Sequence, residues 1–264
     1  MKKKIVMHTA LIGHTGFVGG NLARHAAFDE YYNSKNITSI RGKAFDLLVC
    51  SGVSAVKWWA NQNPVEDKQR IDALLADLAC VHARKVVVLS TVDVYPRTSA
   101  VDESFDCHSH ANHAYGTNRL YFEDTLRNRF EVVTAVRLSG VFGPGLKKNV
   151  LYDLLHDNCL ENINPDSSFQ YYNVSHLWRD LQRLDQTGVR LINFVTESVR
   201  TRDIIDCFFP DRQVGQKRAP EVHYDVRTLY GEQFGGPPGY LRQAEQVMAD
   251  LGEFVTSFQS GASA

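Results

Sequence analysis

A tyrosine and an arginine lie one helical turn apart in the stretch HAYGTNRLYFED, residues 113–124. The pattern predicts a helix over about residues 113–129, and positions i and i+4 of a helix share one face. A phenol with a pKa near its usual value of about 10 is a poor base at neutral pH, so proton transfer by Tyr115 needs a nearby cation. The permanent charge of Arg119 can lower the pKa of Tyr115. The alternative is a salt-bridge or surface arginine on a fold that has lost its activity.

A glycine-rich turn near the start of the chain predicts a phosphate site. The stretch LIGHTGFVGG places Gly13, Gly16 and Gly19 in the spacing GxxGxxG, after a strand and at the start of a helix. The first glycine permits the tight turn, the second permits close approach of a pyrophosphate, and the third permits packing of helix on strand. The backbone amides of Gly16, Phe17 and Val18 would face the phosphates. The alternative is a plain strand-to-helix turn.

The residues about 20 positions after the first glycine bear on the choice of dinucleotide. An acid expected there would hold the adenosine ribose of NAD. The sequence instead has Asn33, Ser34, Lys35 and Asn36. Without a carboxylate to repel a 2′-phosphate, Lys35 or Arg41 can pair with it, which favours NADP over NAD. The alternative is a polar turn with no contact to a cofactor.

The elements that must position these residues alternate along the first 145 residues. Apolar runs predict five strands, at residues 9–13, 30–33, 45–52, 85–91 and 131–138. Amphipathic runs predict helices at residues 17–28, 64–83 and 113–129. Strands that are apolar on both faces and alternate with helices indicate an α/β fold with a doubly wound parallel sheet, the Rossmann fold.

The pattern changes after residue 145. Helices are predicted at residues 146–158, 176–184 and 240–258, and a strand at 189–195. We therefore expect a dinucleotide-binding domain at 1–145, which the strand at 189–195 would rejoin. Residues 146–264 would form a small C-terminal lobe that binds substrate.

Together these stretches resemble the extended short-chain dehydrogenase/reductase family. In the family's order they are the glycine turn at residues 13–19, DLLVCSG at 46–52, VVLSTVDVYP at 87–96, YGTNR at 115–119 and RLSGVFGPG at 137–145. The resemblance implies a Rossmann core, an NAD(P) cofactor and, for most members, a nucleotide-sugar substrate. Arginine stands where the family's Tyr-x-x-x-Lys motif has lysine.

The resemblance also implies roles for single residues. Thr91 would hydrogen-bond the substrate oxygen, Tyr115 would be the general acid/base, and Arg119 would take the place of the lysine that holds the nicotinamide ribose. Ser51 and Gly52, at the end of the third predicted strand, would line the cofactor site. Dehydratases of the family carry acids directly after the threonine, and Val92 in that position disfavours this activity.

Four further residues are candidates for substrate binding. Asp93 lies two residues after Thr91, and Lys57 follows the third predicted strand beside two tryptophans. Lys147 and Lys148, in the stretch GLKKN, would clamp the diphosphate of a nucleotide sugar. For Lys57 the alternative is packing between lobes, and for the lysine pair it is a solvated basic face.

The stretch DCHSHANH has the residue types of a zinc site but an unconvincing arrangement. It holds Cys107, His108, His110 and His113 just before Tyr115. Such residues can bind zinc. We interpret the stretch as a loop that lines the substrate cleft or faces water, and we expect no metal.

The composition excludes several classes of protein. A formal net charge of −1 over 264 residues gives no footprint for nucleic acid or an acidic membrane. The start MKKKIVMH is too short in apolar residues for a signal peptide, and no run long enough to span a membrane occurs. Five scattered cysteines indicate reduced thiols. We expect a cytoplasmic protein and, by the family's resemblance alone, a homodimer through the helices at 64–83 and 113–129.

The sequence therefore predicts an NAD(P)-dependent oxidoreductase or epimerase that acts on a nucleotide-linked sugar. The missing acid at residues 33–36 and the short C-terminal lobe favour a 4-keto-sugar reductase that uses NADPH. An epimerase with tightly held NAD is the nearest alternative. The alternative of another class is a regulatory module that binds the dinucleotide without turnover.

Overall fold

The computed structural model describes residues 7–217 and 219–261. Residues 1–6, which the sequence analysis considered as the start of a signal peptide, lie outside the described part. The chain forms two compact units. Unit 1 comprises residues 1–96, 105–137 and 181–192, and unit 2 comprises residues 97–104, 138–180 and 193–264. Among the described residues, every helix is too short or too polar to cross a membrane.

Unit 1 is built on a six-stranded sheet with the strand order β2-β1-β3-β4-β6-β9. The strands are β1 (Thr9–Ile12), β2 (Glu30–Tyr32), β3 (Ala44–Cys50), β4 (His82–Thr91), β6 (Val133–Leu138) and β9 (Leu191–Phe194). Strand β1 pairs in parallel with β2 and β3, and β3 pairs in parallel with β4. The order reverses at β1, which is the switch point where doubly wound sheets bind ligands.

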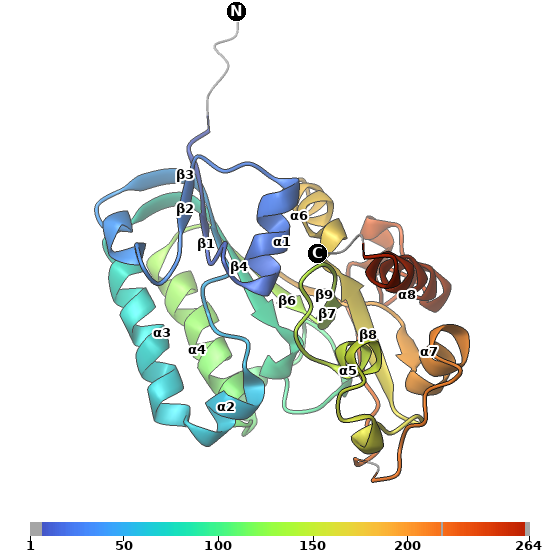
Figure 1. Ribbon diagram of the computed structural model, residues 1–264. Helices are drawn as coiled ribbons and strands as arrows, with labels where there is room; N and C mark the ends of the chain where they lie inside the picture. Colours follow the sequence, from blue (N-terminus) through green and yellow to red (C-terminus); the bar gives the residue numbers. More distant parts are fainter. Residues whose placement is uncertain (1–6, 218, 262–264) are drawn as a thin grey trace, which may run out of the picture. The chain divides into compact units, whose positions relative to one another are not determined.

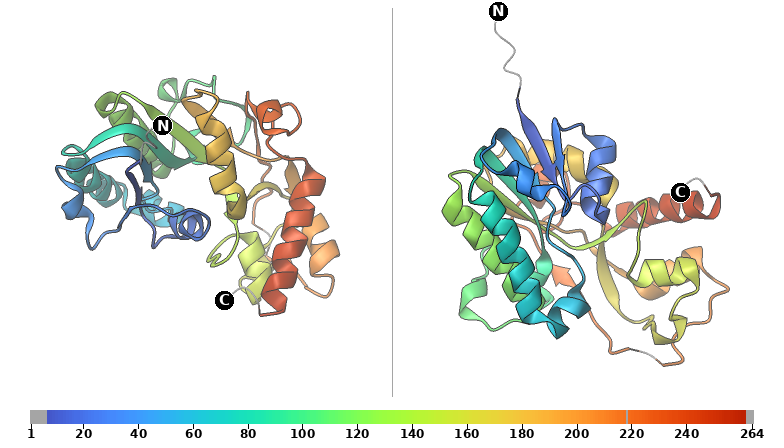
Figure 2. Two further views of the ribbon diagram at one scale, coloured as in Figure 1. Left: turned by 90° about the horizontal axis from the view of Figure 1, so that it is seen from above. Right: turned by 60° about the vertical axis from the view of Figure 1, so that its left-hand side comes forward.

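Helices cover the sheet of unit 1. They are α1 (Phe17–His25), α2 (Lys57–Gln62), α3 (Pro64–Leu78) and α4 (Ala114–Arg129). Figures 1 and 2 show α3 and α4 side by side. Ile71 of α3 and Phe122 of α4 join one core cluster with alternate residues of the strands, such as Leu48 and Val86. Right-handed crossovers put α1 on the other face, because β1 to β2 runs against the direction of β3 to β4. This layering confirms the predicted doubly wound fold.

Unit 2 has a small three-stranded sheet in the order β10-β8-β7 and a two-stranded pair of β11 with β5. Its strands are β5 (Ser99–Val101), β7 (Gly140–Phe142), β8 (Ser168–Asn173), β10 (Ser198–Arg200) and β11 (Asp225–Val226). Its helices are α5 (Val150–His156), α7 (Thr201–Phe208) and α8 (Ala244–Gln259), while α6 (Leu177–Asp185) runs from unit 2 into unit 1. Helices α5, α7 and α8 share one apolar core with this sheet (Figure 2).

Candidate functional site

The glycine turn follows β1 and has the backbone form that its spacing predicts. Gly13 has a φ of +86°, a conformation that residues with a side chain rarely adopt. A Cβ added there would also overlap the Ser51 carbonyl oxygen, at the end of β3. A Cβ on Gly19 would overlap the Gly13 carbonyl oxygen. Glycine is therefore required at both positions by the protein's own packing.

Gly16 differs from its two partners because no neighbouring strand or loop crowds it. A Cβ there would meet only the Gly13 carbonyl oxygen, at 3.3 Å. Gly16 is the N-cap of α1, with no side-chain cap and no acid in the first turn. The first amides of a helix have no partner within it. The amides of Phe17 and Val18 thus remain available to an external anion, and no carboxylate repels one.

The turn after β2 holds the residues that the sequence predicts to border a ribose. The Asn36 side chain accepts from the Asn33 amide at 2.7 Å, and the Asn33 side chain accepts from the Lys35 amide at 2.8 Å. Ser34 and Lys35 are exposed. Arg41 is already engaged, because its Nε lies 2.6 Å from Asp77. Of the two cations that the sequence offered for a 2′-phosphate, Lys35 is the better placed.

Tyr115 lies in the first turn of α4 and is buried, at 5% exposure. Its hydroxyl shares a hydrogen bond with the hydroxyl of Thr91, the last residue of β4. The structure therefore brings together the two residues predicted to act on the substrate oxygen. Burial raises the pKa of Tyr115 to about 12, although Arg119 and the bond to Thr91 both lower it. The phenol is protonated at neutral pH.

Arg119 is buried at 4% exposure and is held by an acid that the sequence analysis did not identify. Its Nη2 lies 3.0 Å from Oδ1 of Asp67, and Nη1 bonds the other oxygen of the same carboxylate. Nη2 also donates to the backbone oxygen of Ser54. The guanidinium stacks on the ring of Tyr115, with its central carbon 4.1 Å from the ring centroid. Arg119 thus packs on the face of the Tyr115 ring.

Asp67 changes what Arg119 contributes. Its negative charge raises the pKa of Tyr115 while Arg119 lowers it, so the pair acts on the phenol as a partly neutralised unit. Asn118 donates to the same carboxylate at 2.9 Å and keeps it satisfied. Asp67 had a sequence signal: it shares a helix face with the buried Ile71 and Leu78. An acid on the apolar face of a helix needs a buried partner.

A second ion pair lies on the Thr91 side of Tyr115. Nζ of Lys57, the first residue of α2, is 2.7 Å from Oδ1 of Asp93. The Asp93 amide donates to the Thr91 hydroxyl at 3.1 Å, and that hydroxyl lies 3.4 Å from Oδ2 of Asp93. Two of the predicted substrate-binding residues are therefore bonded to each other and to Thr91.

The amino end of α4 is fixed by side chains from two segments, residues 112–113 and helix α2. His113 caps the helix, with Nδ1 accepting from the Gly116 amide at 3.0 Å. Asn61 of α2 accepts from the Tyr115 amide at 2.9 Å. Asn112 donates to the backbone oxygens of Asp93 and Val94. Burial, with a smaller effect from Lys57, lowers the pKa of His113, which keeps the cap neutral.

The loop at residues 51–54 contacts both the glycine turn and a side chain of α4. Ser51 and Gly52 pack against Gly13 and Ile12, and the Ser51 amide donates to the Ile12 oxygen at 2.9 Å. Three residues after Ser51, the oxygen of Ser54 accepts from Arg119. One short segment thus contacts both parts of the predicted cofactor site.

The remaining candidates have other surroundings. Cys107 is buried beside Arg137, His108 pairs with Asp124, and His110 stacks on Phe105. No group of residues suited to a metal ion occurs in the described part of the chain. Lys147 and Lys148 are exposed in the loop between β7 and α5 of unit 2.

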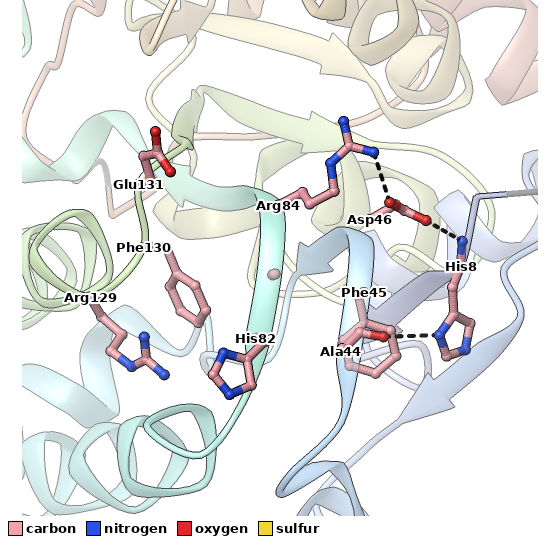
Figure 3. A pocket seen from close by; sticks show the side chains of 10 residues that line it. His8, Ala44, Phe45, Asp46, His82, Arg84, Arg129, Phe130 and Glu131 are labelled. Carbon is pink, nitrogen blue, oxygen red and sulfur yellow. Dashed lines mark hydrogen bonds and ion pairs between the residues drawn. The ribbon is translucent and has the colours of Figure 1, made fainter. Parts of the chain in front are cut away.

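A hollow of about 460 Å³ lies at the amino ends of the strands, opposite the edge that carries Thr91 and Gly13 (Figure 3). Several of its charged side chains are bound to the protein. Arg84 lies 2.9 Å from Asp46, which also accepts from the His8 amide, and Arg129 donates to the oxygens of Ala79 and Val81. Nothing in it offers groups for chemistry.

No family model matches the chain, and no curated protein matches it. Solved structures do resemble it. The UDP-N-acetylglucosamine 4-epimerase of Methanobrevibacter ruminantium, in complex with UDP-N-acetylmuramic acid, has a TM-score of 0.74 and 14% identity. That alignment covers 97% of this chain and 99% of the epimerase.

Two further structures have similar scores. The dTDP-4-dehydrorhamnose reductase of Yersinia enterocolitica has a TM-score of 0.69 and 12% identity, over 95% of this chain and 99% of its own. RMD of Pseudomonas aeruginosa, complexed with NADPH, has a TM-score of 0.69 and 14% identity, over 94% and 98%. At such identities the likeness establishes a shared fold, and it agrees with the Rossmann fold predicted from the sequence.

Proposed function

We propose that this protein is an NAD(P)-dependent oxidoreductase that reduces the 4-keto group of a nucleotide-linked sugar, with NADPH as the cofactor. The observation that carries the proposal is the hydrogen-bonded pair of hydroxyls from Thr91 and Tyr115, next to a loop that also contacts the glycine turn. Two such hydroxyls can bind one carbonyl oxygen and protonate it as it is reduced.

The residues of unit 1 fit a dinucleotide. Gly16 leaves room beside the first amides of α1, where the pyrophosphate would bind. Lys35 would pair with the 2′-phosphate, and Asn33 and Ser34 would border the same ribose. Ser51 and Gly52 would line the nicotinamide side. When bound, NADPH supplies the hydride; the residues of this chain bind it, orient it and supply the proton.

The protonation state of Tyr115 favours reduction over epimerisation. An epimerase must first take a proton from a sugar hydroxyl, which needs a phenolate. With its pKa raised to about 12, Tyr115 holds its proton at neutral pH. A protonated phenol can donate to an oxygen that develops negative charge, since an alkoxide is a stronger base than a phenolate. Thr91 would hold that oxygen in place.

The substrate assignment rests on charge and on similar folds. Lys57 is already paired with Asp93, so we assign the diphosphate to Lys147 and Lys148, which are exposed in unit 2. Ammonium groups of this kind suit a diphosphate. The solved structures that share the fold include enzymes whose names state UDP- or dTDP-linked sugars.

Two other functions each have one observation in their favour. The epimerase from Methanobrevibacter ruminantium shares the fold, so an epimerase with tightly held NAD is the second candidate. The pairing of Arg119 with Asp67 favours the third, a module that binds the dinucleotide without turnover, since the cation is already engaged.

The experiment is a turnover assay of the purified protein with NADPH or NADH and a panel of nucleotide-linked 4-keto sugars. We expect NADPH consumption matched by formation of the reduced sugar. Conversion of a sugar without net consumption of cofactor would support the epimerase. Tight NADPH binding with no turnover of any sugar would support the module.

Two variants make the assay specific. Tyr115→Phe should retain NADPH binding and lose turnover by roughly 10²- to 10⁴-fold, the usual contribution of a general acid. Gly16→Val should keep the fold, because no neighbouring loop crowds that position, and lose NADPH binding.

We also propose that the protein is a cytoplasmic homodimer. All five cysteines are free thiols, as in a reducing compartment. The outer surfaces of α3 and α4 would form the dimer interface, and Val65 and Tyr121 are exposed there. Sedimentation velocity of the purified protein tests this, because a monomer at all concentrations would contradict it.

A further inference from the structure

Tyr115 must regain a proton after each turnover, and its nearest cation cannot supply one. Arginine side chains do not release their protons in proteins. Arg119 is moreover stacked on the ring of Tyr115 and bound to Asp67. In the proposed reduction, each donated proton would leave a phenolate that is buried and costly. Another route for protons is therefore needed.

A chain of hydrogen bonds connects Tyr115 to the surface. Its first link is the bond between the hydroxyls of Tyr115 and Thr91. The second runs from Thr91 Oγ1 to Oδ2 of Asp93, 3.4 Å apart, and the third from Oδ1 of Asp93 to Nζ of Lys57, 2.7 Å apart. The exposed fraction rises outward, to 22% at Asp93 and 37% at Lys57. The chain begins at a buried phenol and ends at an ammonium in contact with solvent.

We propose that Lys57, Asp93 and Thr91 form a proton relay that reprotonates Tyr115 after each reduction. This proposal rests on the proposed reductase function. One N–H bond of Lys57 breaks as an O–H bond forms on Oδ1 of Asp93. The neutral carboxyl group then rotates so that this O–H faces Thr91, and the proton passes to the Thr91 oxygen as the Thr91 proton passes to the phenolate. The net result is one proton moved from Lys57 to Tyr115. Lys57, left neutral, takes a proton from water.

The other charged groups near Tyr115 are not connected in this way. His113 uses Nδ1 to accept from the Gly116 amide, and its ring centroid is 6.3 Å from that of Tyr115. Arg119 and Asp67 face the ring. The longest link of the relay, between Thr91 and Asp93, exceeds the usual hydroxyl-to-oxygen distance of about 2.8 Å. We expect that link to limit the transfer.

The decisive experiment separates the first turnover from later ones. The relay acts only after Tyr115 has donated its proton, so Lys57→Met and Asp93→Asn should give a first hydride transfer close to the wild-type rate. Steady-state turnover should then fall by on the order of 10²-fold, as when an acid–base group is lost. Ammonium chloride, compared with sodium chloride at equal ionic strength, should restore part of that rate in Lys57→Met.

The matched controls are Lys68→Met and Asp72→Asn, which break a lysine–aspartate pair on α3 that is not connected to Thr91. Both variants should leave the rate of the first hydride transfer and the steady-state rate unchanged. Equal slowing of the first and later turnovers in Lys57→Met would overturn the relay, since loss of positioning alone has that effect. Steady-state turnover at the wild-type rate in Lys57→Met would overturn it as well.

A second measurement does not need turnover, so failure of the relay is distinguishable from failure of the proposed function. Fluorotyrosine incorporated at position 115 reports the ionisation of that phenol by ¹⁹F NMR. Asp93 raises the pKa of Tyr115. Asp93→Asn should therefore lower this pKa, and Lys57→Met should raise it. Thr91→Val should raise it too, because the bond from Thr91 lowers the pKa of Tyr115. A titration that none of these changes moves would overturn the connection.

Discussion

Two cation–carboxylate pairs flank Tyr115, and they differ in burial and in chemistry. Arg119 and Asp67 are at most 4% exposed and form a bidentate pair against the ring face. Lys57 and Asp93 are partly exposed, form a single 2.7 Å contact, and reach the hydroxyl side through Thr91. One pair has a charge that never titrates. The other has a lysine that can exchange protons with water.

The difference separates two tasks that a single lysine performs in the family that the sequence resembles. There, one ammonium group lowers the pKa of the tyrosine and holds the ribose. In this protein a permanent cation packs under the ring, and a titratable cation lies at the end of a hydrogen-bonded chain. In the proposed mechanism, Lys57 of α2 and Asp67 of α3 supplement the tyrosine and arginine of α4.

Breaking the buried pair should have the largest effect on stability. Asp67→Ala leaves the Arg119 guanidinium buried without its carboxylate, which costs about 3–5 kcal/mol in comparable cases. Urea unfolding followed by circular dichroism measures it. The double variant Asp67→Leu with Arg119→Met should regain most of the loss, because an apolar pair removes the unpaired charge. A double variant no more stable than Asp67→Ala would contradict this account.

Replacing Arg119 by lysine keeps the positive charge but loses the planar guanidinium. This change should have a smaller effect on stability. Arg119→Lys cannot make both bonds to Asp67 and the bond to Ser54, and one acceptor left unsatisfied costs roughly 1–3 kcal/mol. If Arg119 also serves the cofactor, Arg119→Lys should retain part of the NADPH affinity and turnover, whereas Arg119→Ala weakens both together. Unchanged affinity and turnover in Arg119→Ala would remove the residue from the proposed mechanism.

The helix cap beside Tyr115 should give the protein a pH-dependent stability of about 1 kcal/mol, the usual value of a cap. The pKa of His113 is lowered from 6.5, so the cap is intact above that pH. As pH falls through and below 6.5, protonation of Nδ1 removes the acceptor for the Gly116 amide, and stability is lost. Denaturant unfolding across this range measures it. Asparagine caps a helix without titrating. In His113→Asn, the unfolding free energy should therefore lose this part of its dependence on pH.

The exposed pair should contribute least to stability. Asp93→Asn removes a partly solvated ion pair, worth roughly 0.2–1 kcal/mol. Unfolding measured as for Asp67→Ala gives a direct comparison of the two pairs. A loss as large as that of Asp67→Ala would mean that Lys57 and Asp93 are structural, and the distinction between the pairs would fail.

Residues with a local signature were predictable from the sequence. Gly13 and Gly19 follow a strand and open a helix, and Thr91 ends an apolar run. Their surroundings follow from the sheet, since all carboxyl ends of parallel strands meet at one edge. Tyr115 was identified from its spacing to Arg119. Whether these site residues act as proposed stays a prediction.

The partner of Arg119 was not predicted, because nothing local joins it to Asp67, 52 residues away. Only the packing of α3 on α4 brings the two together. The strands of unit 2 were also not predictable from the sequence. Strands β7 and β10 have three residues each, too short for a periodic pattern. The helix expected at 64–83 ends at Leu78, since residues from His82 onward pair with β3.

The order in which the sheet of unit 1 is completed has a consequence for synthesis on the ribosome. Strand β6, buried at all six residues, lies between β4 and β9, and β9 comes from residues 191–194. A nascent chain must therefore be extended by more than fifty residues before the open edge of β6 finds its neighbour. Until then that edge presents unpaired backbone groups, which promote aggregation. A fragment that ends at residue 145 would keep the edge exposed permanently, so residues 1–145 should be expressed with the full chain.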